Sequence, residues 1–198
     1  MGEITELSFS MPLSVALAGR TSVRDFTPDV ISKSQVDSLL HAAVRAPTAM
    51  HRETWCFVVL QDKALMRRIS DRAKRLFSAQ LKRLHHGGPG QGANPLEDPE
   101  ANVFYNAGTL IVVCAPRDAP FAQADAWLAA QNIVLAAYAG GLGTCVIGSS
   151  VAALELPEVR AELQVPVETA VVAPIIVGVP AHAGTPSERS EPRVLSWV

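Results

Sequence analysis

The sequence lacks the charge pattern and the long apolar runs that mark several common protein classes. Its formal net charge is only -2 over 198 residues, which gives no electrostatic basis for binding nucleic acid or an anionic membrane surface. No apolar run reaches the roughly 18 residues that span a bilayer, and the N-terminus carries Glu3 and Glu6 instead of a basic targeting segment. We therefore expect a cytoplasmic protein with neither a nucleic-acid nor a membrane partner.

Cysteine and the usual catalytic motifs are also scarce. Cys56, Cys114 and Cys145 are odd in number, lie in apolar runs and include no CxxC pair. The adjacent His85 and His86 have no third residue that would complete a metal site, and no Ser/His/Asp set or GxSxG motif is present. We expect reduced cysteines in the core, no metal ion and no protein nucleophile.

Apolar residues, by contrast, are abundant. Hydrophobic residues make up 48% of the chain and charged residues 18%, which leaves apolar surface that another copy of the chain could cover. A chain of this length usually folds as one domain. We therefore expect a single domain over residues 1–198 and a homo-oligomer.

Hydrophobic periodicity predicts alternating helices and strands. Ser32 and Gln35 have the spacing of a capping box, and Asp62 precedes a long periodic stretch. The apolar run from Trp55 has no polar alternation, which predicts a strand covered on both faces. Predicted helices cover 11–19, 32–46, 62–84, 122–139 and 154–163; predicted strands cover 55–60, 109–115, 145–147 and 171–179. This alternation indicates an α+β or α/β sandwich around one central sheet.

Two segments have no periodicity. Residues 85–99 are rich in glycine and proline, which predicts a mobile loop whose length suits a lid. Residues 180–198 are polar and carry Arg189 and Arg193, so we expect a C-terminal arm.

The stretch Arg20-Thr21-Ser22-Val23-Arg24 places two guanidinium groups and two hydroxyl groups within five residues. A guanidinium fork matches phosphate oxygens in a bidentate way, so this composition suits a phosphate. A polar surface loop with exposed arginines explains the same residues.

Residues 47–55 join a predicted helix to a predicted strand, where loops often present polar groups to a ligand. Met50, His51 and Glu53 are the candidate ligand-binding residues, although a lone histidine is more often structural.

Gly140, Gly141 and Gly143 follow a predicted helix and would let the backbone approach a flat ligand. A Rossmann phosphate loop is the competing interpretation, but it requires glycines after a strand, and Val146 stands where its third glycine would be.

Together these patches resemble the FMN-dependent nitroreductase family. Five stretches follow the family's order over most of the chain: RTSVRDFT, APTAMHRETWCFVVL, VFYNAGTLIVVCA, AAQNIVLAAYAGGLGTCVIG and PIIVGVPA. The resemblance implies an α+β fold with a central, mainly antiparallel sheet flanked by helices, in an intertwined homodimer. It also implies bound FMN shared by both subunits, NADH or NADPH as electron donor, and a small-molecule electron acceptor.

The resemblance assigns cofactor contacts but no catalytic side chain, because flavin N5 accepts the hydride. Residues 20–24 would hold the FMN phosphate and ribityl chain, joined by an arginine of the arm. The 48–51 loop would flank the ring, and a backbone N–H of residues 140–142 would bond N5. The implied contacts are Arg20, Thr21, Ser22, Arg24, Thr48, Met50, His51, Gly140, Gly141, Leu142, Gly143, Arg189 and Arg193.

The chain departs from the family's Asn-x-Gln-Pro-Trp pattern, because His51 and Glu53 stand in place of the two amides before Trp55. Their hydrogen-bonding capacities differ from those of amides. The expected reaction is ping-pong reduction of nitroaromatics, quinones or related acceptors by NADH or NADPH. Two alternatives stay open: an enzyme of this fold acting on a specialised metabolite or on flavin, and a flavin-binding protein without catalysis.

Overall fold

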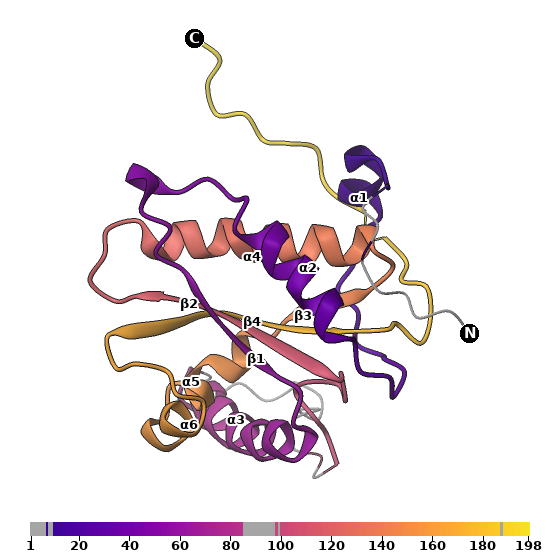
Figure 1. The fold of residues 1–198 in the computed structure, drawn as a ribbon. Coiled ribbons are helices and arrows are strands. Elements are labelled where there is room, and N and C mark those ends of the chain that lie inside the picture. The colour runs from indigo at the N-terminus through magenta and orange to yellow at the C-terminus, as the bar shows by residue number, and fades with distance from the viewer. Residues whose placement is uncertain (1–6, 8–9, 85–97, 99, 187) are drawn as a thin grey trace.

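A computed structural model describes residues 7, 10–84, 98, 100–186 and 188–198 (Figure 1). The predicted 85–99 loop lies outside the described residues except for Asp98.

The centre of the fold is a four-stranded sheet in the order β1-β2-β4-β3 (Figure 1). Every neighbouring pair in it is antiparallel, which confirms the central antiparallel sheet. The strands are β1 (Cys56–Leu60), β2 (Thr109–Pro116), β3 (Gly143–Val146) and β4 (Thr169–Gly178).

Helices cover both faces of this sheet (Figure 1). One face carries α2 (Lys33–Ala43) and the long α4 (Ala122–Ala139), and α1 (Leu13–Gly19) lies against α4. The opposite face carries α3 (Lys63–Leu84), α5 (Val151–Leu154) and α6 (Pro157–Glu162).

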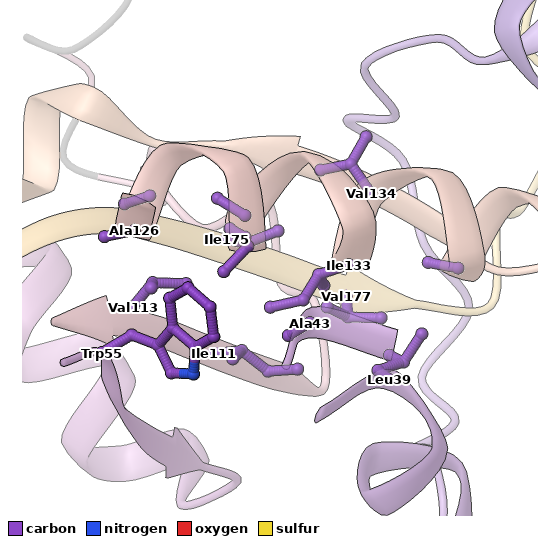
Figure 2. Packing of buried hydrophobic residues seen from close by; sticks show 14 of the residues in the cluster. Leu39, Ala43, Trp55, Ile111, Val113, Ala126, Ile133, Val134, Ile175 and Val177 are labelled. Atoms are coloured by element: carbon purple, nitrogen blue, oxygen red, sulfur yellow. The ribbon is translucent and has the colours of Figure 1, made fainter. Parts of the chain in front are cut away.

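Side-chain alternation along β2 and β4 divides the core into two layers. Ile111 and Val113 of β2 and Ile175 and Val177 of β4 point toward α2 and α4, as Figure 2 shows together with Trp55. The residues between them, such as Val112 and Ile176, point toward α3 and α5. The two central strands are therefore buried on both faces, as their unbroken apolar sequences predict.

Local sequence signals fix several helix ends. The capping box of Ser32 and Gln35 is formed in both directions, and the Asp62 carboxylate accepts hydrogen bonds from the amides of Ala64 and Leu65. The single helix predicted over 154–163 is wrong, because Pro157 begins a new helix after a short break.

One predicted burial pattern is also wrong. Strand β1 is an edge strand with Cys56 exposed and Val59 39% exposed, so it is not covered on both faces and Cys56 is not a core cysteine. In α4, Trp127 and Leu128 face away from the sheet, and the buried side consists mainly of alanines with Ile133 and Val134.

Candidate functional site

The 20–24 segment and the 140–143 bend lie side by side at the edge of the sheet. Ser22 forms a parallel bridge with Thr144, and the amide of Val23 donates a hydrogen bond to the Thr144 carbonyl at 2.9 Å. A Cβ on Gly143 would lie 2.9 Å from side-chain atoms of Val23, so only glycine allows this approach. Two patches that are more than a hundred residues apart in sequence therefore form one surface.

The polar groups of this surface are available to a ligand. Arg20 is half-buried and Arg24 exposed, and neither guanidinium forms a hydrogen bond or an ion pair with the described residues. The hydroxyl groups of Thr21 and Ser22 lie in the same segment. The edge beside β3 thus combines two unpaired positive charges with two hydroxyl groups, which is the composition that an anion requires.

The glycines after α4 have a structural role that the sequence did not reveal. The amides of Gly140, Gly141 and Leu142 donate to carbonyls in the last turn of α4 at 2.9, 3.0 and 2.8 Å. Gly141 has φ +79°, the left-handed geometry that commonly ends a helix. The bend closes α4, and these three amides already have carbonyl acceptors within the last turn of the helix.

The free amides lie a few residues further along. Neither the Gly148 nor the Ser149 amide has an acceptor among the described residues, because these residues begin a 3-10 helix (η3, Gly148–Ser150) just after β3. Gly148 is exposed. Sequence reasoning missed these two residues; the signal was the glycine that ends the apolar run of β3.

The second predicted patch is a strained loop before β1. It includes a short 3-10 helix (η1, Ala49–His51). Met50, His51 and Glu53 all have positive φ, at 58°, 53° and 42°, and such strain in non-glycine residues clusters at functional loops. The amide of Ala49 donates to both carboxylate oxygens of the buried Asp125, at 3.2 and 3.1 Å. Asp125 therefore anchors this loop at the first turn of α4.

This anchor places the loop far from the glycine bend. Asp125 and Gly140 lie fifteen residues apart on α4, and at 1.5 Å per residue they are about 22 Å apart. Thr48 and His51 therefore do not meet Arg20 within one chain. In the same loop the Thr54 hydroxyl is buried and has no hydrogen-bond partner among the described residues.

The predicted arginines of the C-terminal arm do not lie beside the 20–24 segment within one chain. Arg189 and Arg193 are exposed and lie in an extended segment that runs away from the sheet (Figure 1). Trp197 near its end is 92% exposed.

A hollow of about 310 Å³ lies on the α3 side of the 20–24 segment, lined by Phe26, Lys63, Asn106 and their neighbours. It contains none of the predicted site residues.

Comparison with known proteins identifies the family. The sequence profile described as "Nitroreductase family" matches residues 17–179. The chain belongs to the nitroreductase family. Both patches, the bend after α4 and all four strands lie inside the matched range.

One curated relative and two solved structures show how much of the chain is matched. An NADH dehydrogenase of Thermus thermophilus is 25% identical over 205 residues, covering 90% of this chain and 92% of its own length. A Bacteroides fragilis nitroreductase with bound FMN has a TM-score of 0.77 at 23% identity, covering 96% of this chain and 99% of its own. An iodotyrosine deiodinase bound to FMN and 3-iodo-L-tyrosine has a TM-score of 0.70 at 23% identity, covering 92% and 97%.

The nitroreductase fold is thus shared, while the cofactor contacts of this chain's residues stay predictions. Among the residues that the structure describes, none of the helices combines the length and apolar character needed to cross a membrane. That part of the chain also holds no group of three His, Cys, Asp or Glu residues placed to bind a metal.

Proposed function

We propose that the chain is a cytoplasmic, homodimeric oxidoreductase that uses FMN to pass hydride, through flavin N5 and in ping-pong order, from NADH or NADPH to nitroaromatic, quinone or related acceptors. One observation carries the proposal. Arg20 and Arg24, whose guanidinium groups have no partner among the described residues, lie in a segment that packs closely against β3 at Gly143. The family match and the FMN-bound relatives support the choice of cofactor.

The β3 edge would hold the phosphate end of FMN. Arg20 and Arg24 offer unpaired guanidinium groups, and Ser22 is exposed between them. The free amides of Gly148 and Ser149 are the backbone donors available at the other end of β3, where the flavin ring would lie. Thr144 and Gly148 are four residues apart, or about 13 Å of extended chain, which suits a ligand with a phosphate at one end and a planar ring at the other.

The apolar surface around α4 supports a dimer. Trp127 and Leu128 are 48% and 46% exposed on α4, and Leu13 and Leu17 are 65% and 57% exposed on α1. A helix that is apolar on all sides is normally buried, and exposed apolar patches of this kind mark interaction sites. The apolar composition predicts that a second copy of the chain covers this surface of α1 and α4.

A two-fold dimer would also complete the site. If the axis crosses α4, the two copies of α4 run antiparallel, and the start of one lies beside the end of the other. The 48–51 loop of one subunit would then lie beside the 140–143 bend of its partner, although the two are at opposite ends of α4 within one chain. The exposed arm with Arg189, Arg193 and Trp197 would lie on the partner subunit.

In this arrangement the protein positions reactants and contributes no acid, base or nucleophile. Arg20 and Arg24 would fix the phosphate, and the main chain near Gly148 would orient the flavin ring. The strained 48–51 loop would cover the edge of that ring. Positioning of this kind accounts for a large part of the rate in cofactor enzymes.

Purified protein tests the proposal directly. We expect a yellow protein that binds FMN and is bleached anaerobically by NADH or NADPH, and that regains its colour when a quinone or a nitroaromatic is added. Protein that binds FMN but is not reduced by either nicotinamide would support a flavin-binding protein without catalysis. Colourless protein that does not take up FMN would contradict both.

A second candidate keeps the flavin and changes the acceptor. His51 and Glu53 replace the amides of the family pattern, and one structural neighbour is a deiodinase with bound 3-iodo-L-tyrosine. These observations favour an enzyme acting on a specialised metabolite or on free flavin. Reoxidation of the reduced protein by a panel of quinones, nitroaromatics, halogenated phenols and flavins distinguishes the candidates by rate.

A further inference from the structure

Cys56 and Cys114 are direct cross-strand neighbours. The antiparallel register of β1 and β2 pairs Cys56 with Cys114, and residues paired in this way have Cα atoms about 4.5–5.5 Å apart. Disulfides occur at Cα separations of about 4.4–6.8 Å. Both side chains lie on the face that packs against α3 and α5, so the two sulfur atoms can approach each other without a change of register.

The two thiols have opposite environments. Cys114 is fully buried on β2, which is held between β1 and β4. Cys56 is exposed at the start of β1, which pairs with only one strand of the described chain. A solvent reagent can therefore reach Cys56 but not Cys114, and the edge strand can move the small distance that a bond requires.

The ionisation of the pair suits a reactive thiol beside a protonated one. The neighbouring Cys114 thiol, whose hydrogen bond in the structure goes to the Val112 carbonyl, lowers the pKa of Cys56 to about 7, although burial opposes the change. The neighbouring Cys56 and burial raise the pKa of Cys114. Arg160 and Glu155, the charged groups that act on Cys114, have opposing effects there. Near neutral pH a thiolate, the nucleophilic form of cysteine, is thus available at the exposed position.

We propose that Cys56 and Cys114 form a peroxide-responsive dithiol in which the exposed Cys56 attacks the oxidant and the buried Cys114 closes a disulfide. The Cys56 thiolate displaces an alkoxide or hydroxide from a hydroperoxide and becomes a sulfenic acid, while the leaving group takes a proton from water. The Cys114 sulfur then displaces the hydroxyl group of the sulfenic acid, and its proton leaves with that group as water.

Formation of the sulfenic acid removes the negative charge of the Cys56 thiolate, which had kept Cys114 protonated. A sulfenic acid is neutral, so Cys114 can then lose its proton as it attacks. Each turn consumes one peroxide and oxidises two thiols, and an external dithiol reduces the disulfide again. The proposal replaces the expectation of inert core cysteines for this pair only. The buried Cys145 on β3 has no cysteine opposite it and stays outside the pair.

Peptide mapping of the full chain tests the proposal. The folded protein is treated with hydrogen peroxide, then denatured, alkylated and digested. We expect the Cys56 peptide joined to the Cys114 peptide, a link that dithiothreitol breaks and that Cys145→Ala retains. In Cys114→Ala we expect a sulfenic acid at Cys56 that dimedone traps. A free, alkylated Cys114 beside an oxidised Cys56, or a disulfide that contains Cys145, would overturn the proposal.

The pH dependence of alkylation supplies a second measurement that does not need the disulfide. Iodoacetamide should modify Cys56 with a midpoint near pH 7, and Cys114→Ala should shift the midpoint up toward the ordinary value of about 8.5 and slow the reaction at pH 7 by roughly threefold. Cys114→Ser keeps a donor and should keep a low midpoint. Identical profiles for wild type and a folded Cys114→Ala, judged by circular dichroism, would overturn the role of Cys114.

Discussion

At the residue scale, one carboxylate joins three parts of the chain. Glu155 follows α5 and forms ion pairs with Arg117, after β2, and with Arg160 of α6 at 3.0 Å. It also accepts a hydrogen bond at 2.6 Å from the amide of Val171 in β4. Burial alone would raise the pKa of Glu155, but the Val171 amide and the two arginines outweigh it and lower the pKa.

Replacing Glu155 with glutamine should destabilise the protein by about 2 kcal/mol at pH 7, since hydrogen bonds to charged groups are worth about 1.5–3 kcal/mol. A lowered folded-state pKa gives stability that is present above the unfolded value of about 4.3 and lost as pH falls through the folded value. Urea denaturation should therefore show a gap between wild type and Glu155→Gln that closes below about pH 4. The exposed Glu158→Gln is the matched control, and equal stability of wild type and Glu155→Gln at pH 7 would contradict the assignment.

The arginines of the first patch can be tested with two ligands that differ by a phosphate. Arg20→Ala and Arg24→Ala should each raise the Kd for FMN by about tenfold or more, the effect of one charged hydrogen bond, and leave the Kd for riboflavin unchanged. Fluorescence titration measures both, and Arg75→Ala on α3 is the control. Equal losses for FMN and riboflavin would show that these residues do not bind the phosphate.

Residue-scale signals were predictable from sequence where a side chain acts on its own neighbours. The caps at Ser32 and Asp62 were expected and are present. The sequence did not reveal that the amides of Gly140 and Gly141 close α4, because it does not say which carbonyl an amide meets. The availability of Gly148 was missed for the same reason.

At the element scale, the sequence predicted the existence of the main helices and strands, because hydrophobic periodicity is local. The face that a helix buries is decided by its neighbours. In α4 the large side chains Trp127 and Leu128 stay exposed, whereas the small Ala126 and Ala130 face the sheet, since only small side chains allow close approach. Strand β1 was likewise predicted correctly, while its place at the edge was not.

The contact between Asp125 of α4 and the Ala49 amide controls the position of the 48–53 loop. Asp125→Ala should weaken FMN binding several-fold and lower stability by about 1–3 kcal/mol, although we place Asp125 outside the flavin site. Asp125→Asn retains one acceptor, so its FMN affinity and stability should fall between those of the wild type and Asp125→Ala. The exposed Asp118→Ala serves as the control for both titration and denaturation. FMN affinity that is unchanged in Asp125→Ala would remove the loop from the site.

At the scale of the whole molecule, the apolar surface of α4 is the feature that one chain leaves unexplained. Trp127→Glu should convert dimers to monomers in light scattering and abolish tight FMN binding, because a charge on this face must stay in water. Val167, which is 81% exposed in the turn before β4, provides the matched control Val167→Glu. A Trp127→Glu protein that stays dimeric and yellow would place the interface elsewhere.

The separation of the two patches along α4 could not be predicted from sequence. Arg20 and the 140–143 bend are brought together by the bridge between Ser22 and Thr144, whereas His51 lies at the opposite end of the helix. A resemblance gives the members of a site but not which subunit supplies each member.

Subunit mixing tests this sharing of the site most directly. A subunit with Arg20→Ala and Arg24→Ala is co-expressed with a differently tagged subunit carrying Thr48→Ala and His51→Ala, and the heterodimer is isolated by both tags. If each site takes one patch from each subunit, the heterodimer has one intact site and one site damaged in both patches. We predict one tightly bound FMN per heterodimer and almost none in either parental homodimer. A heterodimer with no tightly bound FMN, beside a wild-type dimer that binds two, would contradict the shared site.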